Sequence, residues 1–184
     1  MILAPSEFVA KVCKDSGVTV PIKVVHFPYN PSMETEVYDI DLSKYAVKFL
    51  SIFQWDFRKN WDCLLRSYWS EFLHVKDVVL VIKTYLLTAQ PQELEEILRH
   101  VNSLKGACGI RVNGRDYCIP PPIKIIVDNL TDGQLKDLYK KTDIFVLASR
   151  GEGLGRIFED AIYYNKPIIA TNYSAPTEFL GDGF

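Results

Sequence analysis

Hydrophobic residues follow two alternating patterns along this chain. Continuous apolar runs are typical of strands buried on both faces of a sheet, and we expect such strands at 22–27, 47–53, 78–82, 123–127, 144–147 and 167–170. Between the runs, apolar residues recur at helical spacing, which predicts helices at 6–16, 58–73, 91–104, 132–141 and 156–164. This alternation predicts an α/β fold with a doubly wound, mostly parallel sheet and helices on both faces.

The remaining segments add little regular structure. Segment 29–46 has no clean period and reads as a surface connection, and 106–122 reads as an irregular insertion. In the helix opened by Pro91, we expect four residues to face the core: Leu94, Ile97, Leu98 and Val101. We treat residues 1–184 as a single domain, and because they end directly after a strand and a turn, we expect a fragment of a longer protein.

A glycine-rich turn links the strand at 144–147 to the next helix. Gly151, Gly153 and Gly155 stand within five residues, and Glu152 lies between the first two. Ligands of open α/β sheets bind at the carboxyl ends of strands, and a helix N-terminus favours anions. We therefore expect Glu152 to face a ligand, and Asp160 to face the same cleft from the following helix. A tight turn without a ligand is the alternative.

Neither common nucleotide fingerprint occurs in the sequence. The residues after the strand at 47–53 contain no glycine, Arg156 stands where the turn would need its third fingerprint glycine, and no Walker lysine is present. Two carboxylates with amide donors between them suit a ligand with hydroxyls and phosphates, such as a nucleotide-sugar. Lys59 or Arg58 is placed to hold the diphosphate, at the same sheet edge as Glu152. Both could instead be solvated residues of a helix N-terminus.

Composition narrows the class of protein. A net charge of -2 argues against electrostatic binding of nucleic acid, and no apolar run approaches the roughly 18 residues of a membrane span. The cysteines form no C-x-x-C pair and the three histidines are scattered, so we expect no metal site. Reduced thiols in a cytoplasmic protein are the plain interpretation, although Cys108 and Cys118 could pair across a loop.

Several motifs in sequence order resemble the signature of group 1 glycosyltransferases, the retaining enzymes of GT-B fold. They are Glu152-Gly-Leu-Gly155 with Asp160-Ala161, Lys166-Pro-Ile-Ile-Ala-Thr171, and Pro176-Thr-Glu178. Arg58-Lys59 resembles the turn that follows the first strand of their second domain, and Ser149-Arg150 also fits. Pro5-Ser-Glu-Phe8 resembles the segment that opens that domain.

The resemblance implies a Rossmann-like C-terminal domain, one half of a GT-B fold, that binds a nucleoside diphosphate sugar. The N-terminal acceptor domain would be its partner, and membrane contact would come through that missing domain. The nucleotide-sugar is a co-substrate, and no cofactor or metal is implied. Glu152 would be the catalytic contact to the donor sugar. The other implied donor-binding residues are Lys59, Arg58, Ser149, Arg150, Gly153, Leu154, Gly155, Arg156 and Asp160.

Four positions depart from the family's pattern. Asp160 replaces a glutamate, Gln54 an arginine, Ile157 a proline and Asn60 a glycine. Two rival functions stay open. One is a non-catalytic nucleotide-binding or interaction module on the same fold. The other is a different enzyme class, such as an epimerase or a pyridoxal-dependent phosphorylase; the phosphorylase would need a Schiff-base lysine that nothing in the sequence marks.

Overall fold

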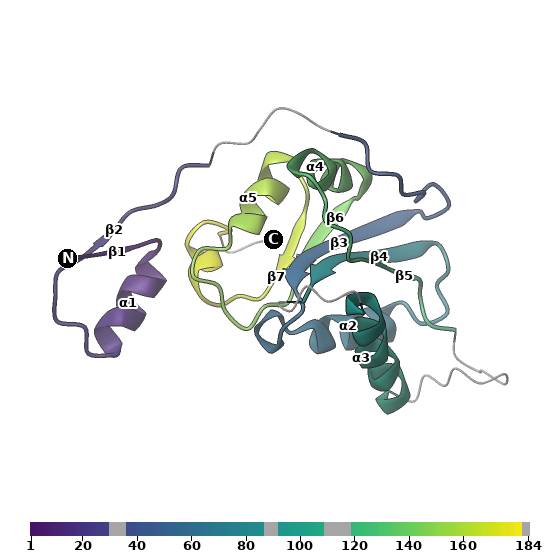
Figure 1. Cartoon of the computed structure of the whole chain (residues 1–184), viewed down its shortest axis with the longest axis horizontal. Coiled ribbons are helices and arrows are strands. Elements are labelled where there is room, and N and C mark those ends of the chain that lie inside the picture. The colour runs from purple at the N-terminus through teal and green to yellow at the C-terminus, as the bar shows by residue number, and fades with distance from the viewer. Residues whose placement is uncertain (30–35, 87–91, 109–118, 182–184) are drawn as a thin grey trace.

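The structure is a computed structural model that describes residues 1–29, 36–86, 92–108 and 119–181. Within these residues the strands form two separate sheets (Figure 1). The larger sheet has five strands in the order β5-β4-β3-β6-β7. Its strands are β3 (Val47–Gln54), β4 (Val78–Tyr85), β5 (Ile123–Ile126), β6 (Ile144–Leu147) and β7 (Ile168–Ala170).

Every pairing in the five-stranded sheet is parallel, which confirms the predicted fold class. The chain moves outward from β3 through β4 to β5, then returns to place β6 and β7 on the other side of β3. The strand order therefore reverses between β3 and β6. In open α/β sheets, this switch point is where ligands bind, outside the carboxyl ends of the strands.

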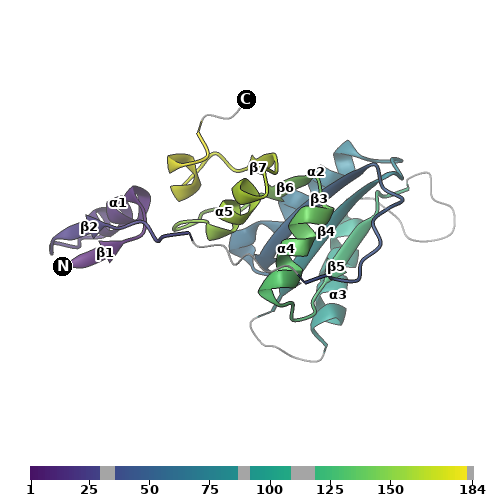
Figure 2. The same cartoon turned by 90° about the horizontal axis from the view of Figure 1, so that it is seen from above.

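Helices cover both faces of this sheet, as predicted. Figure 1 and Figure 2 show α2 (Trp61–Glu71) and α3 (Glu93–Ala107) on one face, and α4 (Asp132–Lys141) and α5 (Arg156–Tyr163) on the other. Two short 3-10 helices, η1 (Phe57–Lys59) and η2 (Ala175–Glu178), lie in the connections. Leu50, Leu65, Leu138 and Phe145 are fully buried between the layers, which places the core on both sides of β3 and β6.

One prediction about α3 is wrong. Ile97 and Val101 are buried as expected, but Leu94 and Leu98 are 40% and 41% exposed. The helix buries the row formed by Ile97, Val101 and Leu104, and at about 100° per residue Leu94 and Leu98 fall on its flank. The buried stripe of α3 is therefore narrower than the sequence predicts. Pro91 lies outside the described residues, as do residues 109–118 of the expected insertion and Cys118 with its possible disulfide.

The N-terminal residues form the second sheet at one end of the molecule (Figure 1). It pairs β1 (Ile2–Ala4) in parallel with β2 (Ile22–Val24), and α1 (Glu7–Asp15) connects them. The predicted helix is confirmed with Ser6 as its cap, since the Ser6 side chain accepts a hydrogen bond from the Val9 amide at 3.2 Å. Neither β1 nor a separate sheet was predicted from the sequence. We call this β1–α1–β2 part the small unit.

Candidate functional site

The glycine turn, residues 148–155, leaves the carboxyl end of β6 and leads into α5, as predicted. Gly155 is the N-cap of α5 with a φ of 86°, a left-handed conformation that side chains rarely adopt. A Cβ at this position would lie 2.9 Å from Cδ2 of Phe158. Glycine is therefore required at Gly155 by the backbone and by the close approach of Phe158.

The centre of the site is a cluster of three charged side chains, which we call the Glu152 cluster. Nζ of Lys59 lies 2.5 Å from Oε1 of Glu152, and Nη1 of Arg58 lies 3.0 Å from Oε2. The Glu152 and Lys59 side chains are only 11% and 12% exposed, whereas Arg58 is half exposed. The prediction that Lys59 and Glu152 share one edge of the sheet is confirmed.

Two cations hold the carboxylate of Glu152 in its charged form. Burial acts to raise the pKa of Glu152, but the hydrogen bond and charge of Lys59, a hydrogen bond to Ser149 and the charge of Arg58 together outweigh it, and the pKa is lowered. The cluster therefore carries two positive charges against one negative. This surplus positive charge at the carboxyl edge of a parallel sheet suits an anionic ligand.

Local structure explains why Lys59 reaches the turn. Asp56 caps η1 by accepting a hydrogen bond from the Lys59 amide at 3.0 Å. Asn60 then adopts a left-handed conformation with a φ of 56°, which separates η1 from α2. Asparagine tolerates this conformation better than most residues, so it serves where the resembling family has glycine. The helix expected from residue 58 is thus broken at Asn60, and Lys59 points to Glu152.

Neighbouring polar groups fix the glycine turn. The Ser149 hydroxyl accepts a hydrogen bond from the Gly151 amide at 3.1 Å, and the Glu152 amide donates to Oγ of Ser174 at 2.9 Å. Arg150 packs its guanidinium 4.1 Å from the ring centre of Phe57, and its Nη2 lies 3.6 Å from Oδ1 of Asp62. Among the described residues, nothing accepts from the amides of the remaining predicted set: Gly153, Leu154, Gly155 and Arg156. These amides lead into the N-terminus of α5, where an anion is favoured.

Asp160 belongs to a different network in this structure. Its Oδ1 accepts a hydrogen bond from the Tyr29 hydroxyl at 2.7 Å, and burial together with this bond raises the pKa of Tyr29. Tyr29 comes from the connection after β2, and its ring lies 6.0 Å from that of Tyr163. The structure shows no contact between Asp160 and the Glu152 cluster, so a shared cleft stays a prediction.

A lysine that the sequence analysis passed over is buried in β4. Lys83 is 7% exposed and its ammonium donates to the backbone oxygen of Thr84 at 3.0 Å. Burial lowers the pKa of Lys83, although the charges of Glu93 and Asp128 oppose this shift. Lys83 directly follows the apolar run 78–82, so the sequence pattern suggests that the strand ends before it. In the structure β4 continues past Lys83 to Tyr85. Lys83 is therefore a buried lysine near the carboxyl end of β4 that could not be recognised from the sequence.

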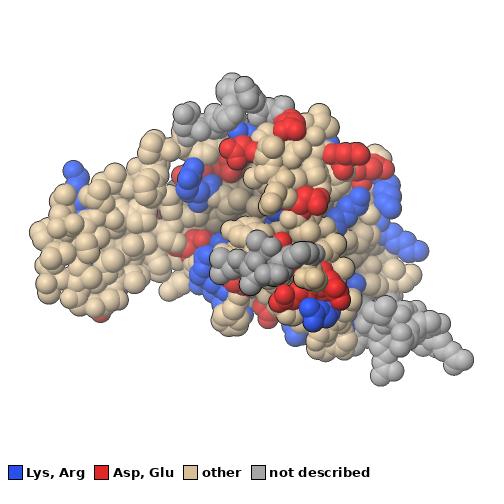
Figure 3. Space-filling model, viewed as in Figure 1, with Lys and Arg blue, Asp and Glu red and all other residues tan. Residues whose placement is uncertain are grey.

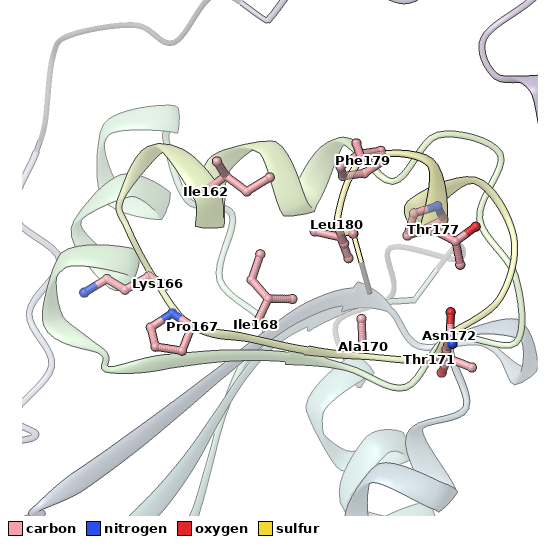
Figure 4. A pocket seen from close by; sticks show the side chains of 12 residues that line it. Ile162, Lys166, Pro167, Ile168, Ala170, Thr171, Asn172, Thr177, Phe179 and Leu180 are labelled. Carbon is pink, nitrogen blue, oxygen red and sulfur yellow. The ribbon is translucent and has the colours of Figure 1, made fainter. Parts of the chain in front are cut away.

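The candidate site is identified by its charged side chains and not by the volume of a cavity. A hollow of about 600 Å³ lies between α5, β7 and η2, and Figure 4 shows apolar side chains such as Ile168 and Leu180 within it. Among the described residues no carboxylate lines it, and its lysine, Lys166, donates to the Thr142 backbone at 2.6 Å. The hollow beside Glu152 measures only about 10 Å³. On the face in Figure 3, acidic and basic side chains are interspersed, without a large basic patch.

The comparisons with known proteins agree with this geometry. Residues 125–184 match the family model of glycosyl transferases group 1. This segment carries the group 1 glycosyltransferase pattern. The resemblance drawn from the sequence is thereby confirmed, and the match contains the glycine turn, Glu152 and Asp160. No curated protein sequence matches the chain.

Two solved structures of similar fold contain UDP and a sugar. Anabaena Alr3699/HepE in complex with UDP and glucose is similar over all of this chain and 48% of its own, with a TM-score of 0.71 and 12% identity. The pneumococcal O-GlcNAc transferase GtfA, with UDP and GlcNAc, is similar over 98% of this chain and 32% of its own, with a TM-score of 0.57 and 17% identity. This chain therefore spans about a third to a half of these structures. At such identity the likeness confirms the fold alone, which is one half of a GT-B fold.

Two features are absent from residues 1–29, 36–86, 92–108 and 119–181, the part of the chain that the structure describes. No helix in them is long and apolar enough to cross a membrane. No three histidine, cysteine, aspartate or glutamate side chains gather there in a way that could hold a metal ion.

Proposed function

We propose that this chain binds the donor, a nucleoside diphosphate sugar, of a retaining glycosyltransferase. The observation that carries the proposal is the Glu152 cluster, which sets Lys59 and Arg58 beside a carboxylate at the glycine turn. The group 1 match over residues 125–184 supports it, as do similar folds solved with UDP and a sugar. Sugar transfer breaks the bond between the anomeric carbon and the diphosphate oxygen, so charge builds up on the diphosphate where cations stabilise it.

Each part of the cluster has a distinct role in this proposal. Lys59, Arg58 and the open amides from Gly153 to Arg156 hold the diphosphate, and the Glu152 carboxylate accepts hydrogen bonds from sugar hydroxyls. Because Lys59 is already paired with Glu152, an arriving diphosphate has to share or displace that carboxylate. Two protein cations meet the charge of the leaving group without a metal, so a chelator is expected to leave binding unchanged.

The test is a thermal-shift screen over nucleoside diphosphates, followed by titration of the best one and of its nucleoside. A ligand that binds only the folded state raises the melting temperature. Lys59→Ala removes a charge-assisted hydrogen bond of about 1.5–3 kcal/mol, so diphosphate affinity falls roughly 10–100-fold while nucleoside affinity stays unchanged. Lys76→Ala is the control, because Lys76 is exposed and precedes β4 at the opposite edge of the sheet. Equal losses for both ligands would make Lys59 an ordinary surface residue.

We further propose that the acceptor is held by an N-terminal domain outside these 184 residues. The similar structures are two to three times as long as the part that this chain matches. Orienting donor and acceptor in near-attack geometry lowers a barrier by about 7–11 kcal/mol, and the Glu152 cluster orients the donor alone. The chain is then expected to bind nucleoside diphosphate but to transfer no sugar. Calorimetry paired with an assay of labelled nucleotide-sugar tests this, and transfer by the isolated chain would refute it.

A non-catalytic nucleotide-binding module is the second candidate. One observation favours it, namely that Asp160, implied as the ribose contact, already accepts a hydrogen bond from Tyr29. Under this alternative, binding survives in the complete protein but sugar transfer does not. The deciding measurement is transfer by the chain together with its N-terminal domain, compared with the Glu152→Gln variant of the same protein.

A further inference from the structure

The small unit contacts η2 through the N-terminus of α1. The carboxylate of Glu178 accepts hydrogen bonds from the amides of Glu7 at 3.0 Å and Phe8 at 2.7 Å, across about 170 residues of sequence. A carboxylate at a helix N-terminus completes free N–H groups and complements the helix dipole. The anion position of α1 is thus filled by the protein itself, whereas that of α5 is open to a ligand.

Ser6 makes the second contact, directly to the glycine turn. Its hydroxyl is buried and donates to the backbone oxygen of Gly153 at 2.7 Å while it accepts from the Val9 amide. A trans peptide is planar, so its C=O and the following N–H point in opposite directions. The bond from Ser6 therefore turns the Leu154 amide away from α1.

The same turn is held from its other side. Nη1 of Arg58 donates to the backbone oxygen of Gly151 at 3.1 Å, and Ser174, the cap of η2, accepts from the Glu152 amide. η2 also carries Glu178, so this one short helix connects the glycine turn to α1. The rings of Phe8 and Tyr173 meet edge to face, 5.5 Å apart, beside these bonds. Thus α1, η2 and the turn form one hydrogen-bonded assembly around Glu152.

We propose that Ser6 and Glu178 are positioning residues for the donor site. Glu178 anchors α1, and Ser6 on the anchored helix fixes the peptide between Gly153 and Leu154 so that its amide faces the diphosphate. The inference rests on the proposed donor-binding function. Seating of the small unit and binding of the diphosphate then strengthen each other, and by thermodynamic linkage the effect is reciprocal.

The anchor is tested first, in the absence of ligand, by hydrogen exchange at the Glu7 and Phe8 amides. Glu178→Gln is expected to accelerate exchange of both at least fivefold. Glu7→Gln is the control, since it removes the same charge from the first turn of α1 without touching the anchor. Equal exchange in the Glu178→Gln and Glu7→Gln variants would overturn the anchor.

The second test measures the affinity of the protein and its variants for inorganic pyrophosphate, UDP and uridine. Ser6→Ala and Glu178→Gln are each expected to lower pyrophosphate and UDP affinity about fivefold or more, with uridine affinity within twofold. Ser16→Ala, an exposed serine at the other end of α1, is expected to change none of them. Glu178→Gln removes a negative charge, so simple repulsion predicts tighter anion binding, and that result would overturn the proposal.

The two proposals fail in distinguishable ways. If the unchanged chain binds neither UDP nor pyrophosphate, the donor-binding function fails, and the positioning role fails with it whatever the exchange at α1 shows. If the chain binds both but the Ser6→Ala and Ser16→Ala variants behave alike, donor binding stands and the positioning role is refuted. Equal losses of UDP and uridine in the Ser6→Ala variant would show a general loss of structure, which also refutes positioning.

Discussion

The ion pair between Glu152 and Lys59 allows a quantitative test in the ligand-free protein. Both side chains are nearly buried, at 11% and 12% exposure, so solvent screens their interaction much less than that of a surface pair. Glu152→Gln keeps the shape of the side chain and removes its charge, whereas Lys59→Met keeps the apolar stem and removes the ammonium. Glu152→Gln leaves Lys59 without its carboxylate partner, Lys59→Met leaves Glu152 paired with Arg58 alone, and the double change removes both charges of the pair.

The structure sets the expected size of the effect. A hydrogen bond to a charged group contributes about 1.5–3 kcal/mol, and the half-exposed pair with Arg58 adds about 0–1 kcal/mol. Glu152→Gln is therefore expected to lower the unfolding free energy by about 1.5–4 kcal/mol. For a chain of this size, 1 kcal/mol corresponds to about 2–4 °C, so the melting temperature falls by about 3–16 °C. The coupling energy between the two positions should be about 1.5–3 kcal/mol.

The assay is urea unfolding at pH 7 of the unchanged chain, both single variants and the double variant. The exposed pair Lys11–Asp15 on α1 is the control cycle, since its side chains are 73% and 61% exposed. Such a pair is expected to couple by only about 0.3–0.5 kcal/mol. If the Glu152–Lys59 coupling is no larger than the control, the cluster does not stabilise the fold and the argument from burial is wrong.

The Glu152→Gln variant also relates the stability of the protein to its affinity for UDP. Glu152→Gln frees Lys59 from its carboxylate and removes a negative charge beside the proposed diphosphate position. Affinity for UDP without a sugar is therefore expected to rise although the protein is less stable. A loss of UDP affinity that tracks the loss of stability would show that Glu152 organises the turn and does not compete for Lys59.

Three other predictions follow from single positions. The pKa of Glu152 is lowered from its ordinary 4.5, so its stabilising effect is present above that pH and lost below it; acid unfolding of the Glu152→Gln variant should show a shallower decline there. Gly155→Ala should lower the unfolding free energy by about 1–3 kcal/mol, because its Cβ would meet Phe158, whereas Gly106→Ala in α3 meets nothing and should raise it by about 0.5–1 kcal/mol. Asp160→Asn should weaken binding of ribonucleotides but not of analogues lacking both ribose hydroxyls, and equal losses in titrations would refute a ribose contact.

Local signals explain why much of the fold could be predicted. Thr131 and Gln134 form a reciprocal capping box at the N-terminus of α4. The start of this helix therefore depends on residues next to it in the sequence. The apolar run 144–147 had the same limits as β6 because both its faces are covered. β4 instead continues to Tyr85, because Lys83 and Thr84 are buried by tertiary packing that no local pattern reports. The types of the elements could thus be predicted from periodicity, but the predicted end of a strand was wrong where polar residues are buried.

Some contacts of the site could be predicted from the sequence, whereas others could not. Lys59 and Glu152 could be placed together because each follows the carboxyl end of a strand, and β3 and β6 are parallel neighbours. The bonds of Ser6 to Gly153 and of Glu178 to α1 join separate sheets across about 150–170 residues, and no periodicity relates such segments. Topology within one sheet can thus be inferred from sequence, whereas docking between two sheets depends on single polar side chains. The anchor on α1 is therefore the part of the site for which the structure adds most, and the Glu178→Gln variant tests it most directly.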